Sequence, residues 1–118
     1  LKKYIEKKYQ TEIIGCKTIR NGKKLALSSR NILLKKNQLT KAEKFTQRII
    51  AFKKSILKTK VTTQILDKKK SELSKLFKIK IQYFELRSAI NFKISNNIKN
   101  SKIFVAFFIN KIRLIDNF

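Results

Sequence analysis

The chain has 118 residues, enough for one domain with a single modest hydrophobic core. It carries 30 basic against 7 acidic residues, a formal net charge of +23, with no histidine and one cysteine. The chain therefore lacks the usual general base near neutral pH and the commonest metal ligand, and one cysteine excludes an internal disulfide. We expect no catalytic residue and no metal ligand in this chain, and a reducing, cytoplasmic compartment.

The excess of basic residues would ordinarily indicate nucleic-acid binding, because such a chain gains affinity by releasing phosphate counterions. However, 25 of the 30 basic residues are lysines spread over the whole chain, whereas nucleic-acid readers rely on arginine for bidentate and stacking contacts. We therefore favour a solvated lysine surface. A small RNA-binding or ribosome-associated protein stays as the alternative.

The first residues predict a helix and then a strand. Residues 1–9 place Leu1, Tyr4 and Ile5 on one side and lysines near the end, which is typical of the tail of a helix. Residues 11–16 contain adjacent β-branched isoleucines, which favours a short strand.

Two helices are predicted in the middle of the chain, after a turn at Asn21-Gly22. The first begins at a capping box formed by Thr40 and Glu43. Its apolar residues follow at spacings of three and four: Ala42, Phe45, Ile49, Phe52 and Ile56. The second runs from about residue 63 to 77. Its inward residues are Leu66, Leu73, Leu76 and Phe77.

The last third of the chain changes to the period of strands. Residues 79–86 alternate apolar and polar side chains, residues 91–101 favour a loop, and residues 103–109 are apolar on both faces, typical of a covered strand. That apolar run is far shorter than the roughly 20 residues that span a bilayer, so we expect no membrane helix. Asn110-Lys111 predicts a turn into a last strand over 112–115. The predicted fold class is α+β, a small antiparallel sheet of about three strands packed with helices.

The stretch LALSSRN, residues 25–31, is a candidate anion site. Two hydroxyls beside a guanidinium offer several hydrogen-bond donors to a phosphate. The structural alternative is that Ser28 and Ser29 only cap a short helix over residues 31–34.

Three motifs in this order resemble the pantothenate synthetase (pantoate-β-alanine ligase) family. They are TEIIGCKTIRNGKKLALSSRNILL at 11–34, IQYFELR at 81–87 and FVAFFINKIRLIDN at 104–117. The first contains the family's GLAxSSRN signature, with Lys23-Lys24 where the family has an acidic or other polar residue followed by glycine, and the last ends in RLIDN. Ser88 stands where the family has an aspartate, and Asn110 stands where it has a turn glycine.

The resemblance implies a ligase of pantothenate biosynthesis that condenses pantoate with β-alanine through a pantoyl adenylate, using ATP and Mg²⁺. It implies that residues 1–22 are the last helix and strand of a Rossmann-like, N-terminal nucleotide-binding domain, and that residues 23–118 are the C-terminal domain. The family's histidine motif is absent from this chain, as is any methionine. We therefore expect a piece of a longer chain, inactive alone, and a homodimer in the full protein.

The resemblance also implies which residues bind the nucleotide. Ser28, Ser29 and Arg30 would hold the ATP phosphates, with the backbone of Ile19 and Leu27 near the nucleotide. The substitutions at Lys23, Lys24 and Ser88 leave a further alternative, an inactive remnant of the ligase. For Arg113, Asp116 and Asn117 we predict no catalytic role but a structural contact, with Arg113 paired to Asp116.

Overall fold

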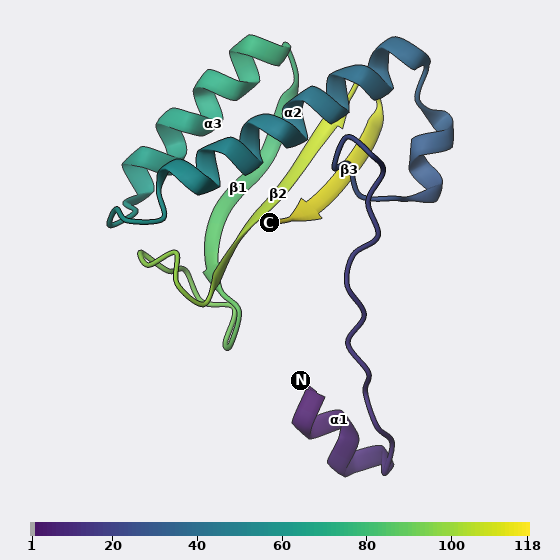
Figure 1. The fold of residues 1–118 in the computed structure, drawn as a ribbon, viewed down its shortest axis with the longest axis vertical. Coiled ribbons are helices and arrows are strands. Elements are labelled where there is room, and N and C mark those ends of the chain that lie inside the picture. Colours follow the sequence, from purple (N-terminus) through teal and green to yellow (C-terminus); the bar gives the residue numbers. More distant parts are fainter. Residues whose placement is uncertain (1) are drawn as a thin grey trace.

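Three strands form an antiparallel sheet in the order β1-β2-β3 in the computed structural model, which describes residues 2–118 (Figure 1). The strands are β1 (Lys80–Ser88), β2 (Ser101–Ile109) and β3 (Ile112–Asn117). The central strand β2 is the most apolar, and its Val105 and Ala106 are fully buried. Asn110 takes a φ of 54° in the turn before β3, a left-handed conformation that asparagine tolerates well. The three strands predicted after residue 78, the loop between the first two and the turn at Asn110-Lys111 are confirmed. The predicted alternation along β1 is interrupted by a bulge between Ile81 and Tyr83, so that Phe84 is buried.

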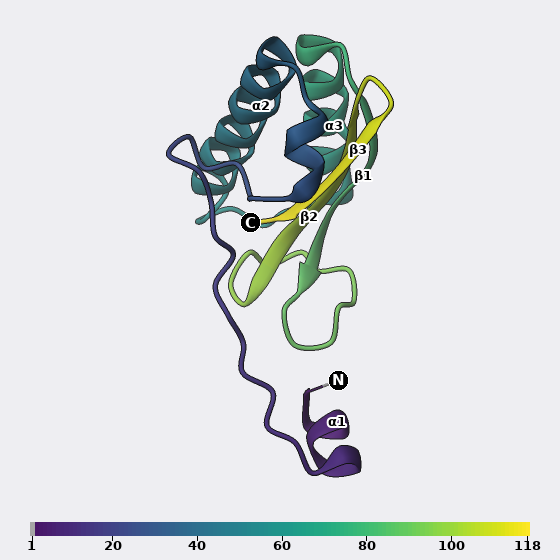
Figure 2. The same cartoon turned by 90° about the vertical axis from the view of Figure 1, so that its right-hand side faces the viewer.

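Two long helices, α2 (Lys36–Ser55) and α3 (Thr63–Phe77), pack on the same side of the sheet (Figure 2). Phe45 of α2 is fully buried, and its ring centroid lies 4.3 Å from that of Phe107 on β2. Leu66 and Leu73 of α3 join the same core. The α+β class is confirmed. No helix among residues 2–118 is long and apolar enough to cross a membrane.

Helix α2 begins four residues before the predicted capping box. Gln38 accepts a hydrogen bond at its Oε1 from the amide of Lys35, over 2.8 Å, and so supports a helical turn that starts at Lys36. Thr40 is already helical, and its hydroxyl donates to the carbonyl of Lys36 over 3.0 Å. The capping box at Thr40 and Glu43 is therefore wrong.

The helix α3 has the predicted bounds, and one of its four inward assignments is wrong. Leu66 and Leu73 are buried and Phe77 packs against the core, but Leu76 is 57% exposed. At 3.6 residues per turn, Leu76 lies to one side of the stripe that the other three define. Lys78 ends the helix in a left-handed conformation with a φ of 49°.

The N-terminal segment forms the helix α1 (Lys2–Tyr9) and then runs as an extended chain to the domain (Figure 1). Leu1, placed on the helix face by the sequence pattern, lies outside the described residues. The strand predicted over 11–16 does not form in the part of the chain that the structure describes. A strand needs a neighbouring backbone, and this segment pairs with none of β1–β3. The amide of Ile13 donates instead to Glu6 Oε1 over 2.9 Å. The division of the chain after residue 22 stays a prediction.

Candidate functional site

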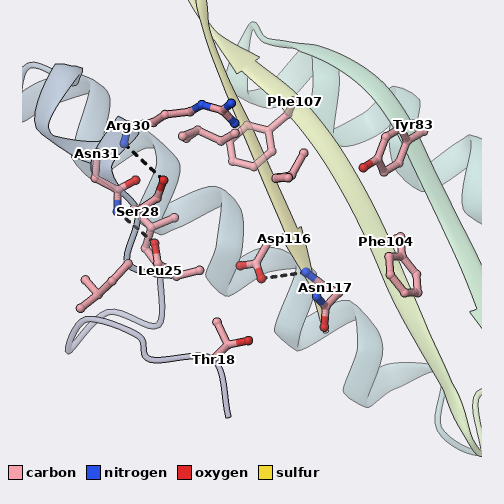
Figure 3. A pocket seen from close by; sticks show the side chains of 14 residues that line it. Thr18, Leu25, Ser28, Arg30, Asn31, Tyr83, Phe104, Phe107, Asp116 and Asn117 are labelled. Atoms are coloured by element: carbon pink, nitrogen blue, oxygen red, sulfur yellow. Dashed lines mark hydrogen bonds between the residues drawn. The ribbon is translucent and has the colours of Figure 1, made fainter. Parts of the chain in front are cut away.

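A hollow of about 430 Å³ lies between the LALSSRN stretch and the sheet (Figure 3). It is bounded on one side by the loop and on the other by side chains from all three strands. Its walls include Leu27, Ser28, Arg30, Tyr83, Phe104 and Asp116. Its volume falls within the range of about 300 to 1,000 Å³ that is typical of small-molecule sites.

One asparagine, Asn21, shapes the loop that precedes the bend at Ser28-Ser29-Arg30. Asn21 Oδ1 accepts from the amides of Lys23 and Leu25, each over 3.0 Å, and the amide of Asn21 donates to the carbonyl of Leu25 over 2.9 Å. Leu25, at 4% exposure, fastens the loop to the core. The predicted turn at Asn21-Gly22 is confirmed, because the amide of Lys24 donates to the carbonyl of Asn21 over 2.9 Å, and its positive φ, 73°, falls at Lys24. The family's glycine at position 24 thus matches a backbone that favours glycine, and lysine adopts it at some cost.

The bend itself opens the short helix η1 (Ser29–Leu33). Ser28 caps it, accepting from the amide of Arg30 at Oγ over 3.2 Å, and Asn31 Nδ2 donates to the carbonyl of Ala26 over 2.9 Å. The capping alternative therefore holds for Ser28 but not for Ser29. All three residues of the Ser28-Ser29-Arg30 bend are exposed to solvent, so none of them packs in the core and all can contact a ligand.

Arg20 connects the loop to the end of β3. Its Nη1 and Nη2 donate to the two carboxylate oxygens of Asp116 over 2.7 and 2.8 Å, and further bonds reach the carbonyls of Asn117 and Lys24, each over 2.9 Å. The Asp116 side chain is 5% exposed. This pair corrects the predicted contact of Asp116 with Arg113.

Arg113 instead donates from Nε to Gln82 Oε1 over 2.8 Å. Residues three apart on a strand point to opposite faces of the sheet, so Arg113 and Asp116 are not placed to pair with each other.

Three of the five residues predicted to bind the nucleotide line the hollow, and two do not. Leu27, Ser28 and Arg30 line it, whereas Ser29 only flanks it. Ile19 is 72% exposed and lies outside the lining, but its carbonyl accepts from the amide of Leu27 over 2.9 Å.

Several lining residues escaped sequence reasoning. Asn31 and Asp116 sit inside the SSRN and RLIDN motifs and could have been found there. Tyr83 and Phe104 belong to the other two motifs, IQYFELR and FVAFFINKIRLIDN, but as aromatic residues of predicted strands they carry no signal for a binding role. Asn31 Oδ1 is buried and accepts no hydrogen bond from residues 2–118.

The charges around the hollow favour an anion. Arg30 makes only a long contact, 3.5 Å, to the carbonyl of Arg113, so its guanidinium keeps most of its donors. Asp116, the single acidic residue among the described lining residues, is already paired with Arg20. Within residues 2–118, no cluster of histidine, cysteine or carboxylate side chains could hold a metal ion. The arrangement can bind and orient an anion.

Known proteins are similar to this chain in sequence. A family model described as pantoate-beta-alanine ligase matches residues 2–118. The pantothenate synthetase of Flavobacterium psychrophilum is 31% identical over 99% of this chain and 43% of its own length, and that of Clostridium novyi is 32% identical over 93% and 40%. The chain thus spans about two fifths of the length of these curated relatives.

Two solved structures are similar as well. The pantothenate synthetase of Thermus thermophilus has a TM-score of 0.80 at 21% identity, covering 98% of this chain and 43% of that one. A pantoate-beta-alanine ligase from Francisella tularensis, complexed with beta-gamma ATP and beta-alanine, has a TM-score of 0.66 at 30% identity, covering 98% and 37%.

Proposed function

Because the chain belongs to the pantoate-β-alanine ligase family, we propose that it is the part of such a ligase that binds the ATP phosphates, with residues 23–118 as its C-terminal domain. The reaction is the condensation of pantoate with β-alanine through a pantoyl adenylate. The observation that carries the proposal is the exposed Ser28-Ser29-Arg30 bend at a hollow whose only acidic residue, among those described, is neutralised. A similar protein was solved with an ATP compound and β-alanine, which supports both ligands.

Each residue of the bend has a distinct task in this proposal. Arg30 supplies a planar fork of donors to phosphate oxygens, and the Ser29 hydroxyl supplies another donor. Ser28 holds the bend through its bond to the Arg30 amide. These donors are in position before the reaction, so they stabilise the charge that builds on the leaving pyrophosphate.

The backbone of Ile19 and Leu27 suits the rest of the nucleotide. The Leu27 amide is bonded to the Ile19 carbonyl, while the reciprocal bond is not among those within residues 2–118. The Ile19 amide and the Leu27 carbonyl are therefore free to bond a nucleobase edge. Mg²⁺ would be held by the phosphate oxygens, which it commonly prefers in nucleotide sites. The nucleotide-binding domain, the second protomer of a homodimer and the cytoplasmic location stay predictions.

The test uses the complete protein that contains this chain. Arg30→Ala is expected to slow pantoate-dependent exchange of pyrophosphate into ATP by about 10²- to 10³-fold, as for other preorganised donors, with an unchanged unfolding temperature. Ser29→Ala should lower the rate less. Arg48→Ala removes an exposed arginine on α2, outside the hollow, and should leave the rate unchanged. Normal exchange in Arg30→Ala would refute the phosphate role, and no exchange in the unmodified protein would favour the inactive remnant.

A further inference from the structure

Asp116 is an unexpected residue to find in the wall of a site for phosphates. Its side chain is 5% exposed and forms part of the hollow beside the Ser28-Arg30 bend (Figure 3). A carboxylate here, without a counterion, would repel a triphosphate bound in the hollow. Something must cancel this charge before the hollow can accept a polyanion.

Arg20 is placed to cancel it. The guanidinium approaches Asp116 from outside the hollow, which it does not line, and meets both carboxylate oxygens over 2.7 and 2.8 Å. Its remaining donors reach the carbonyls of Lys24 and Asn117, and the ring centroid of Phe118 lies 4.9 Å from its central carbon. These bonds use all four Nη donors of Arg20 and hold its guanidinium in one position outside the hollow, and only its Nε–H has no partner among residues 2–118.

We propose that Arg20 sets the nucleotide affinity of the hollow by neutralising Asp116, without itself touching the nucleotide. The inference rests on the proposed function, because it takes the ligand to be a polyphosphate. Arg20 is then a positioning residue, and its effect should scale with the number of phosphates on the ligand. If the Arg20–Asp116 pair only held the loop in place, its loss would weaken the binding of phosphorylated and unphosphorylated ligands equally.

The experiment compares ATP, AMP and adenosine on the complete protein by isothermal titration calorimetry. Arg20→Met should weaken ATP at least about tenfold, AMP less, and adenosine hardly at all, because only the phosphates meet the uncovered carboxylate. The double variant Arg20→Met with Asp116→Asn should recover most of the ATP affinity, although the hydrogen bonds between positions 20 and 116 are lost. Arg87→Met breaks a pair of the same kind with Glu85, outside the hollow, and should change nothing.

Two further variants keep the test decisive if Arg20→Met does not fold. Asp116→Asn alone removes the negative charge while Arg20 stays, so ATP should bind at least as tightly as in the unmodified protein. Arg20→Lys keeps the positive charge and should keep most of the ATP affinity. Equal losses for ATP and adenosine, or weaker ATP binding in Asp116→Asn, would overturn the inference. An unmodified protein that binds no ATP would overturn the proposed function itself, a distinct result.

Discussion

Asn21 donates from its side-chain amide to Glu43 Oε1 over 2.8 Å, and this bond joins the loop before the phosphate-binding bend to α2. Glu43 is 7% exposed, and its other partner is the exposed Lys23, at 3.5 Å. The Asn21 side chain also accepts from the amides of Lys23 and Leu25. One side chain thus both shapes the loop and attaches it to the helix.

Asn21→Ala should therefore lower the free energy of unfolding by about 2 to 3 kcal/mol, because it removes these bonds and leaves a buried carboxylate with one exposed partner. Urea denaturation measures the change. Gln47→Ala removes an exposed side chain with a long 3.4 Å bond to the Lys23 carbonyl and should cost less than about 0.5 kcal/mol. A loss in Asn21→Ala as small as the one expected for Gln47→Ala would show that the Asn21 contacts contribute little.

Phe45 is the packing centre between α2, α3 and the sheet. It is fully buried, with ring centroids 4.3 Å from Phe107 and 5.6 Å from Phe77. Phe45→Ala should destabilise the fold by about 3 to 5 kcal/mol by leaving a cavity. Leu76→Ala, at a 57% exposed position, should cost less than about 0.5 kcal/mol in the same denaturation assay. A large loss there would mean that Leu76 is covered in solution.

Lys78 carries a side chain where the backbone favours glycine. Its φ of 49° ends α3 in the left-handed region, so Lys78→Gly should stabilise the protein by about 0.5 to 1 kcal/mol. Lys75→Gly, in the last turn of the same helix, should destabilise it by about 1 kcal/mol. Thermal unfolding of the two variants should therefore shift in opposite directions, and shifts of the same sign would contradict this account.

Lys53 makes stability depend on alkaline pH. Burial, and then the charge of Lys102, lower the pKa of Lys53 from its usual 10.5. Below the lowered pKa both the folded and the unfolded chain hold the proton, and folding bears the full penalty of burying the charge. Between the two pKa values the unfolded chain binds more protons, so stability rises with pH there.

Lys53→Met should consequently raise the unfolding temperature at pH 7, and the gain should shrink as the pH approaches 10.5. Lys54→Met, at an exposed neighbour on α2, should have no comparable pH-dependent effect. A gain from Lys53→Met that persisted unchanged at alkaline pH would assign the effect to packing and not to charge.

The elements that sequence periodicity predicted well are those whose own residues determine them. The 3.6-residue stripe from Ala42 to Ile56 marks a face that packs on the core. The alternation from Ile79 predicts a strand correctly but its buried face only as far as Ile81, because the bulge in β1 then turns Phe84 inward. The start of α2 was not predicted, because the side chain of Gln38 bonds back to the amide of Lys35 and begins the helix before the capping box expected at Thr40 and Glu43. The strand predicted over 11–16 depended on a partner that its own sequence cannot supply.

The site was predictable only in part for a similar reason. A motif marks the Ser28-Ser29-Arg30 bend, because the chemistry is local in the chain. The pairing of Arg20 with Asp116 joins residues 96 positions apart, and no spacing rule reaches across that separation. Tyr83 and Phe104 line the hollow only because strand pairing brings them there.

That separation bears on how the protein is made. During synthesis the guanidinium of Arg20 leaves the ribosome 96 residues ahead of its carboxylate, so the attachment of the loop over residues 19–27 to the sheet forms only after β3 has been made. Without Asp116 the loop would keep its attachments to α2 and the core through Asn21 and Leu25 but lose its attachment to the sheet. Changes at position 116 should thus act on the same loop as changes at position 20.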